Sequence, residues 1–543
     1  MRPLAFRLAL ALPLAAACAH RSPAPPAPPP PPAALPVPAA PPHPDLGPVR
    51  AGAEAVLRTQ ADAAWRALAL GEAADPAAAW AGHEGLLSDA TLADLAAVAE
   101  PAGDEARSAH LLRAWLLGER LGRASAAAGR QAAQGRAAAA FAWGGRQVAL
   151  REVPALLADE HDADRRRSLA EAATAAAQPV LPLSAAREGA VRAEAHALGF
   201  RSTLALAAEL RGERPEALAA LAQEVLAGTE ELWRGLRDEL ARAEGLAPEE
   251  VRTHDLPRLL RDAVPARAFP ADKGIETAVA VLSGMGLAPG HAGLRIEAAA
   301  RPGTLSAPIA LPLDPPADVR VSAAPVAGLE ALRALLHELG VAESYAHAAP
   351  ELPVELRWLG SPALPEAAGR LLEEVAGSAD WLVEHGVEPE RARTEARAAA
   401  ARRLLRAREA AARLLAAVGR ARAPGPAVPG EEAALAARAC GCAAEPYGPV
   451  AWQLDPDPLL RSAEALRAEL LAAELERALA ARAGGAPWWR AQGSGAFLAA
   501  AWAKGGRRTP EEVARALGAS GLGPAALVAV VRARGAVEAA RGP

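Results

Sequence analysis

The sequence predicts a mainly α-helical fold with one small β-sheet. Three observations lead to this prediction. Alanine, leucine, arginine and glutamate, which favour helices, dominate the composition. Segments in which apolar and polar residues alternate, as they do in strands, are few and lie close together. The chain of 543 residues is long enough for one large two-lobed domain or for two domains.

Residues 1–17 have the pattern of a signal peptide. Arg2 and Arg7 accompany an apolar stretch that is too short to span a bilayer. The next residue, Cys18, ends a run that resembles a bacterial lipobox. We therefore expect Cys18 to be lipidated and to anchor the protein to a membrane of the bacterial cell envelope. The alternative is an ordinary cleaved signal peptide. Alanine rather than aspartate after Cys18 favours the outer membrane, facing the periplasm.

Residues 18–48 are expected to form a linker. About half of the residues from 23 to 48 are proline, which favours an extended polyproline helix over a packed core. At about 3.1 Å per residue, such a spacer reaches on the order of 80 Å. A disordered signalling ligand is the alternative. Beyond the linker we expect an N-terminal helical lobe, residues 49–290, and a second domain, residues 291–543.

Composition and charge argue against nucleic-acid binding. The net charge is −5, and Lys273 and Lys504 are the only lysines, so the many arginines reflect a bias toward GC-rich codons. No glycine-rich phosphate loop, Gly-x-Ser-x-Gly motif or internal repeat is present. Cys440 and Cys442 form either a small strained disulfide or two thiols, and the two alone do not make a metal site.

The expected helices of the N-terminal lobe follow the spacing of their apolar residues. The longest carries Leu218, Leu221 and Val225 on one face, and these side chains are assigned to the core. A short helix is expected after His254-Asp255. The longer expected helices are residues 51–73, 104–122, 162–177, 184–199 and 214–244.

The pattern changes near residue 294. Three short runs separated by proline and glycine, residues 294–297, 306–311 and 319–322, predict the only convincing sheet. Helical spacing then returns. The expected helices are residues 328–347, 364–384, 388–421, 457–483, 510–517 and 523–540.

The helix at 328–347 carries the most informative motif, His337-Glu338-Leu339-Gly340-Val341. A zinc-peptidase helix has two histidines at positions i and i+4, so that both point toward one metal ion. Here the second position is valine. The motif therefore indicates a zinc site from which one ligand has been removed.

The order of features around this motif resembles a known family. After the sheet and the His-Glu helix come Glu351-Leu352-Pro353 and then Glu366, 29 residues beyond His337. An Asp-Pro-Asp-Pro run follows at residues 455–458. This order is similar to the gluzincin metallopeptidases of the oligoendopeptidase F and thimet oligopeptidase type, over most of residues 180–540. The resemblance implies a zincin-like, oligopeptidase-type fold of two helical lobes.

The resemblance also implies roles for individual residues. In active members two histidines and a distant glutamate hold Zn²⁺ and a water, and the glutamate beside the first histidine is the general base. By this correspondence His337 matches the first metal ligand, Glu338 the base and Glu366 the third ligand. Val341 matches the second ligand, and its isopropyl group cannot bind a metal.

Two further departures bear on activity. Arg370 lies one helical turn beyond Glu366, where a guanidinium would repel a dication. We expect Arg370 to replace the metal by pairing with Glu366 and Glu338; the alternative is an ordinary surface pair. In the C-terminal region, where relatives carry an oxyanion-binding tyrosine, this chain has Glu464-Ala465-Leu466.

Three other residues near the motif have side chains that can bind a metal ion. His347 is about 15 Å along the helix from His337, too far to share a metal, and is expected to be a buried, hydrogen-bonded histidine. Glu343 is expected to face solvent. Glu373 shares the face of Glu366 and could complete a site of one histidine and two carboxylates.

These features leave three hypotheses about function. The first is an inactive pseudopeptidase of the cell envelope that binds no cofactor and recognises a peptide or a protein partner. The second is an active zinc metallopeptidase with a non-standard set of ligands. The third is a helical envelope lipoprotein with a structural role only. Zinc is expected only under the second.

Overall fold

The computed structural model describes residues 45–98, 103–287, 293–298, 304, 306–422, 429–443 and 445–540. The expected signal peptide, Cys18 and most of the linker lie outside these residues. The described residues belong to one compact unit, with no division near residue 290. None of the helices in the described ranges is long and apolar enough to cross a membrane.

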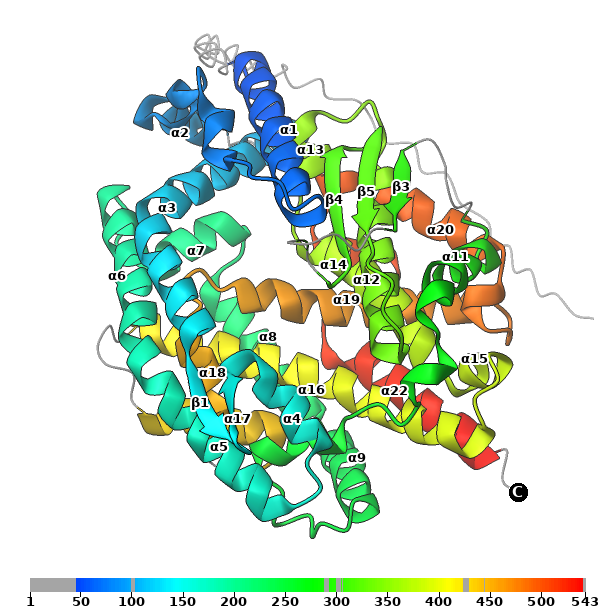
Figure 1. The fold of residues 1–543 in the computed structure, drawn as a ribbon. Coiled ribbons are helices and arrows are strands. Elements are labelled where there is room, and N and C mark those ends of the chain that lie inside the picture. Colours follow the sequence, from blue (N-terminus) through cyan, green and yellow to red (C-terminus); the bar gives the residue numbers. More distant parts are fainter. Residues whose placement is uncertain are drawn as a thin grey trace, which may run out of the picture. The chain divides into compact units, whose positions relative to one another are not determined.

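The predicted mainly α-helical fold is confirmed (Figure 1). The first half of the unit is formed by α1 (Gly47–Ala69), α2 (Asp89–Val98), α3 (Asp104–Ala138), α4 (Val153–Asp159), α5 (Ala163–Ala177), α6 (Leu181–Ala197), α7 (Thr203–Arg211), α8 (Pro215–Gly228), α9 (Glu230–Ala243), α10 (Leu256–Leu259) and α11 (Gly274–Gly284). The second half is formed by α12 (Leu329–Ala346), α13 (Val354–Trp358), α14 (Ala363–Glu373), α15 (Ala379–Glu384), α16 (Pro389–Arg422), α17 (Pro429–Cys440), α18 (Tyr447–Leu454), α19 (Arg461–Arg482), α20 (Gly493–Trp502), α21 (Pro510–Ala516) and α22 (Pro524–Ala540).

The helix expected at 214–244 is interrupted. It divides into α8 and α9 at Thr229, and the buried guanidinium of Arg408 lies at the break. Arg408 Nη1 donates to the carbonyl of Leu226 and to Thr229 Oγ1, both at 2.9 Å. Because Arg408 belongs to α16, its hydrogen bonds at this break connect the expected N-terminal lobe to the expected second domain. The two expected domains also share one hydrophobic core, in which Leu226 and Leu404 are fully buried.

A β-hairpin occurs where no strand was expected. Strands β1 (Ala140–Trp143) and β2 (Arg146–Ala149) pair in antiparallel fashion through Gly144 and Gly145. Both glycines have positive φ, 54° and 79°, the backbone that a two-residue hairpin turn requires. The Gly-Gly pair between alternating residues was therefore a usable signal.

The predicted three-stranded sheet is present. Its order is β3 (Leu294–Glu297), β5 (Asp318–Ser322) and β4 (Ile309–Asp314), with β3 parallel and β4 antiparallel to β5. Strand β4 begins three residues later than expected, at Ile309, and lies at the edge of the sheet. Figure 1 shows the sheet beside α12, against which β4 and β5 pack.

Below the sheet, α12 packs against α14, and α14 packs against α19. Their apolar faces meet in a core that includes Leu336, Leu339, Leu371, Leu372 and Leu471. The helix expected at 364–384 is shorter than predicted, because α14 ends at Glu373 and a 3₁₀ turn precedes α15. This packing places the His-Glu motif opposite Glu366.

Candidate functional site

Two glycines allow α12 and α14 to come close together. A Cβ atom added to Gly340 would lie 2.4 Å from the carbonyl oxygen of Ala368. A Cβ atom added to Gly369 would lie 2.8–2.9 Å from three atoms of the His337 ring. Such distances are shorter than van der Waals contact, so only glycine fits without movement. The close crossing of these two helices fixes His337 against α14.

The His337 ring lies between two carboxylates of α14. Its Nε2 is 3.4 Å from Glu366 Oε2, and its Nδ1 is 3.4 Å from Glu373 Oε2. Burial of the ring opposes protonation, but the two carboxylates outweigh burial and raise the pKa of His337 to about 9. The bond from His337 in turn lowers the pKa of Glu366. The structure thus brings His337, Glu366 and Glu373 together.

Glu338, which the resemblance matches to the general base, faces the sheet. Its Oε2 accepts a hydrogen bond of 2.7 Å from the backbone N–H of Ala310 in the edge strand β4. Burial raises the pKa of Glu338, against the opposing effect of this hydrogen bond. The carboxylate therefore ties α12 to the edge strand.

The residues present do not fit a zinc ion. Val341 is half-buried and supplies no donor atom. Glu366 and Glu373 approach different nitrogens of the His337 ring, so a metal on either nitrogen would meet only one of the two carboxylates. Among the described residues, no group of three or more histidine, cysteine, aspartate or glutamate side chains is arranged to hold a metal ion.

Arg370 has partners other than those expected. It pairs with Glu373 (Nη1 to Oε2, 3.0 Å) and with Glu469 of α19 (Nε to Oε1, 3.3 Å). The expected pairs with Glu366 and Glu338 are replaced by these two. The guanidinium is 27% exposed and lies between two helices, so it is also not an ordinary surface pair.

Behind the site, Arg406 of α16 joins three carboxylates. It contacts Glu373 at 3.0 Å, Glu374 at 2.9 Å and Glu469 at 2.7 Å. Burial of Glu373 opposes ionisation, but Arg406, His337 and Arg370 lower its pKa well below its usual range. We call the whole set the ionic cluster. Its members are His337, Glu366, Arg370, Glu373, Glu374, Arg403, Arg406, Glu469, Glu476 and Arg534.

The deepest part of the ionic cluster is almost sealed from solvent. The side chain of Arg403 is 0% exposed and pairs with Glu476. Arg534 of α22 contacts Glu476 Oε1 at 2.9 Å and also pairs with Glu374. Burial of Glu476 opposes ionisation, yet Arg534 and Arg403 lower its pKa to about 2. Sequence reasoning found none of these four residues, because their partners lie on different helices.

Glu343 and His347 of α12, and Glu464 where relatives carry a tyrosine, all have partners within the protein. Glu343 was expected to face solvent but is completely buried, and its Oε2 lies 3.1 Å from His347 Nδ1. His347 is hydrogen-bonded as expected, but its side chain is 23% exposed and so is only partly buried. Glu464 accepts a hydrogen bond of 2.6 Å from Ser361 and pairs with Arg467 at 3.0 Å, so it too is neutralised within the protein.

The two cysteines of α17 and its C-terminal turn are free thiols. Cys440 is buried and Cys442 is partly buried. Gly441 between them has a φ of 65°, the left-handed conformation that glycine adopts readily.

Comparison with known proteins shows the fold. No family model and no curated protein matches the chain. Among solved structures, one similar chain is assigned as oligoendopeptidase F and was determined by X-ray crystallography at 3.1 Å. The TM-score is 0.64 and the sequences are 14% identical, over 90% of this chain and 96% of that chain. The chain therefore has the helical, metallopeptidase-like fold that its sequence predicts.

Proposed function

We propose that this protein is a pseudopeptidase, an oligopeptidase-like chain that has lost zinc-dependent hydrolysis and that recognises peptides or a protein partner. One observation carries the proposal. The imidazole of His337 lies between Glu366 and Glu373, one carboxylate at each ring nitrogen, while Val341 stands in the position of the second histidine. Three donors cannot converge on one point in this arrangement.

Charge balance supports the same proposal. A catalytic zinc ion is normally held by three protein ligands and offsets the charge of its carboxylate. Here Arg370 and Arg406 already neutralise Glu373, and His337 lies against Glu366. The protein's own cations occupy the electrostatic role of a metal.

The site nevertheless remains open to other molecules. The Glu366 side chain is 45% exposed, in contrast to Glu373 at 13%. An accessible carboxylate suits the binding of a peptide. The edge strand β4, in which Glu338 occupies the backbone N–H of Ala310, suits an extended peptide because an edge strand has unpaired backbone groups. We further propose that lipidated Cys18 and the proline-rich linker hold this body at a membrane of the cell envelope.

Elemental analysis and a cleavage assay test whether zinc binding and peptide hydrolysis have been lost. We expect the purified protein to contain less than about 0.1 zinc per molecule, because a two-ligand site binds zinc far more weakly than a three-ligand site. It should cleave neither casein nor a fluorogenic oligopeptide. One tightly bound zinc per chain, with proteolysis that a chelator abolishes, would overturn the proposal.

Restoring the missing groups gives the matched control. Val341→His supplies the second imidazole, and Arg370→Phe removes a cation that acts on both His337 and Glu366. The double variant should gain zinc, while each single variant should gain less, because the site needs both a third donor and less positive charge. A double variant that takes up no zinc would show that Val341 is not the position of a lost ligand.

A further inference from the structure

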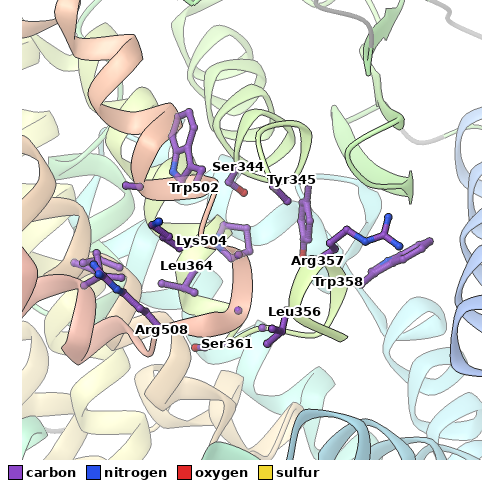
Figure 2. Close-up of a pocket in the computed structure, with 18 of the residues that line it drawn as sticks. Ser344, Tyr345, Leu356, Arg357, Trp358, Ser361, Leu364, Trp502, Lys504 and Arg508 are labelled. Atoms are coloured by element: carbon purple, nitrogen blue, oxygen red, sulfur yellow. The ribbon is translucent and has the colours of Figure 1, made fainter. Parts of the chain in front are cut away.

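A small pocket lies beside the ionic cluster, beyond the first turn of α14. It is enclosed by the ends of α12 and α13, the start of α14, the middle of α19 and the segment that follows α20 (Figure 2). Its cavity volume is about 70 Å³. Because one water needs about 10–15 Å³ on this measure, the pocket holds about five waters. That is space for one side chain and not for a length of peptide.

The walls of the pocket are mainly apolar. Trp502 and Tyr345 contribute rings, and Leu356, Leu364 and Leu475 contribute aliphatic groups. Figure 2 shows Trp502, Tyr345, Leu356 and Leu364 coming from separate helices around one space. Such a lining favours an apolar group of similar size.

Every ionisable side chain that lines the pocket, apart from Tyr345, is a cation: Arg357, Lys504 and Arg508. Arg357 is already paired, with Glu54 at 3.4 Å and Asp314 at 3.9 Å. Lys504 and Arg508 are exposed at the pocket, and neither forms an ion pair with any carboxylate in the described part of the chain. In Figure 2 both lie on the opposite side of the view from Arg357.

The pocket lies next to the candidate site. Leu364 and Pro365 line it, and the next residue along α14 is Glu366. Tyr345 is shared as well: burial raises the pKa of Tyr345 to about 12, and the nearby Glu366 carboxylate adds to this effect. The end of a chain bound at Glu366 would therefore lie near the pocket.

We infer that the pocket binds the C-terminal residue of a peptide, with an apolar side chain among the rings and leucines and the terminal carboxylate at Lys504 and Arg508. Unpaired cations at the edge of an apolar cavity complement an anionic group on an apolar body. The small volume selects a terminal residue. This inference rests on the proposed peptide binding, and it adds that the free end of the peptide is recognised. A free N-acyl amino acid has the same chemistry.

The test compares two peptides that differ only at the end. A fluorescent hexapeptide ending in leucine is used as the free acid and as the C-terminal amide, with binding to the full chain followed by anisotropy. A charge-assisted hydrogen bond contributes about 1.5–3 kcal/mol, so the free acid should bind about tenfold tighter or more. Equal affinity of the acid and the amide would overturn the inference and leave peptide binding intact.

Variants assign the preference to the two cations. In Lys504→Gln with Arg508→Gln, the preference for the free acid should disappear. Arg507→Gln is the matched control, because Arg507 is adjacent in sequence but already pairs with Asp104 at 3.0 Å. The control should keep the full preference. A preference that survives in the double variant would place the carboxylate elsewhere and overturn the inference.

N-acetyl-leucine, titrated by calorimetry, separates this inference from the proposed function. If it binds and the hexapeptides do not, the chemistry of the pocket is supported and peptide recognition is wrong. If both hexapeptides bind and N-acetyl-leucine does not compete with them, the pocket assignment is wrong and the proposed function stands. If neither binds, both fail.

Discussion

Two cationic regions near α14 differ in whether their charges are paired. In one region, Arg370 and Arg406 of the ionic cluster each contact two or three carboxylates. In the other, Lys504 and Arg508 stand at the pocket without an acidic partner among the described residues. The first set of charges is saturated within the protein. The second set is available to a ligand.

The difference shows how buried carboxylates in this fold are balanced by the protein's own cations. A buried carboxylate that loses its counter-charge is costly, so a site such as Glu373 needs a cation of some kind. Here arginines from α14 and α16 supply it. Under the proposed function, recognition depends on the charges that remain free, Lys504 and Arg508, which line the pocket next to the start of α14.

The largest effect should come from the sealed end of the ionic cluster. Arg403→Met removes a cation whose side chain is 0% exposed and leaves Glu476 and Glu374 short of one partner. Breaking a buried pair from one side costs about 3–5 kcal/mol. Urea denaturation followed by circular dichroism should show that loss in the free energy of unfolding.

A surface pair provides the control for Arg403→Met. Arg66 contacts Glu72 at 2.8 Å, and both side chains are about half exposed. Surface pairs of this kind contribute little, so Arg66→Met should leave the unfolding midpoint unchanged. If Arg403→Met behaved like Arg66→Met, the ionic cluster would not hold these helices together.

The same cluster should make the protein sensitive to acid. The pKa of Glu476 falls from 4.5 to about 2 in the folded chain. The unfolded chain therefore binds more protons between these values, so the stabilisation is present above about pH 4.5 and is lost as the pH falls toward 2. A shift of this size corresponds to on the order of 3 kcal/mol.

Urea titrations at a series of pH values test the acid effect. Glu476→Gln should weaken the dependence of unfolding free energy on pH in the acid range, because the group that titrates is gone. Glu276→Gln removes an exposed carboxylate that pairs with Lys273 and should reproduce the wild-type curve. If the unfolding free energy of Glu476→Gln changed with pH in parallel with that of the wild type, Glu476 would not be a source of the acid sensitivity.

Local sequence signals predicted much of the fold. Residues 388–421 and 294–297 were expected as a helix and a strand, and α16 and β3 match them within one residue. The break at Thr229 was not predictable, because Arg408, which binds there, is 179 residues away. Spacing along a helix describes one buried face and carries no information about a distant side chain.

In the candidate site, too, some contacts were predictable from the sequence and others were not. The family resemblance placed His337 opposite Glu366, and the structure brings them to 3.4 Å. The predicted partners of Arg370 were wrong. Helical spacing pointed to Glu366, whereas Glu469 approaches from another helix. Glu343 was assigned to solvent for a similar reason: one helical face was assumed to be free, but α12 is covered on several sides.

A smaller effect on stability is expected when two helical glycines are replaced by alanine, and its sign should differ between the two positions. Gly369→Ala places a methyl group about 2.8 Å from the His337 ring, so it should destabilise the fold by about 1–3 kcal/mol, as overpacking does. Gly118→Ala in α3 meets no atom within 4 Å and should stabilise the fold by up to about 1 kcal/mol, from helix propensity. Thermal unfolding of both variants should give shifts of opposite sign; shifts of the same sign would mean that α12 and α14 are not in close contact.

The smallest effect on stability should occur at the pocket, where the cations have no acidic partner in the described part of the chain, in contrast to the paired cations of the ionic cluster. Lys504 and Arg508 are exposed and form no ion pair with the described carboxylates, so neither offsets a buried charge. Lys504→Gln with Arg508→Gln should leave the unfolding midpoint unchanged in urea at neutral pH, while Arg403→Met under the same conditions lowers it. Because the double variant removes two cations and Arg403→Met removes one, the comparison separates the number of charges from their pairing. A midpoint that fell as far in the double variant would mean that Lys504 and Arg508 already have partners inside the protein and are not free for a ligand.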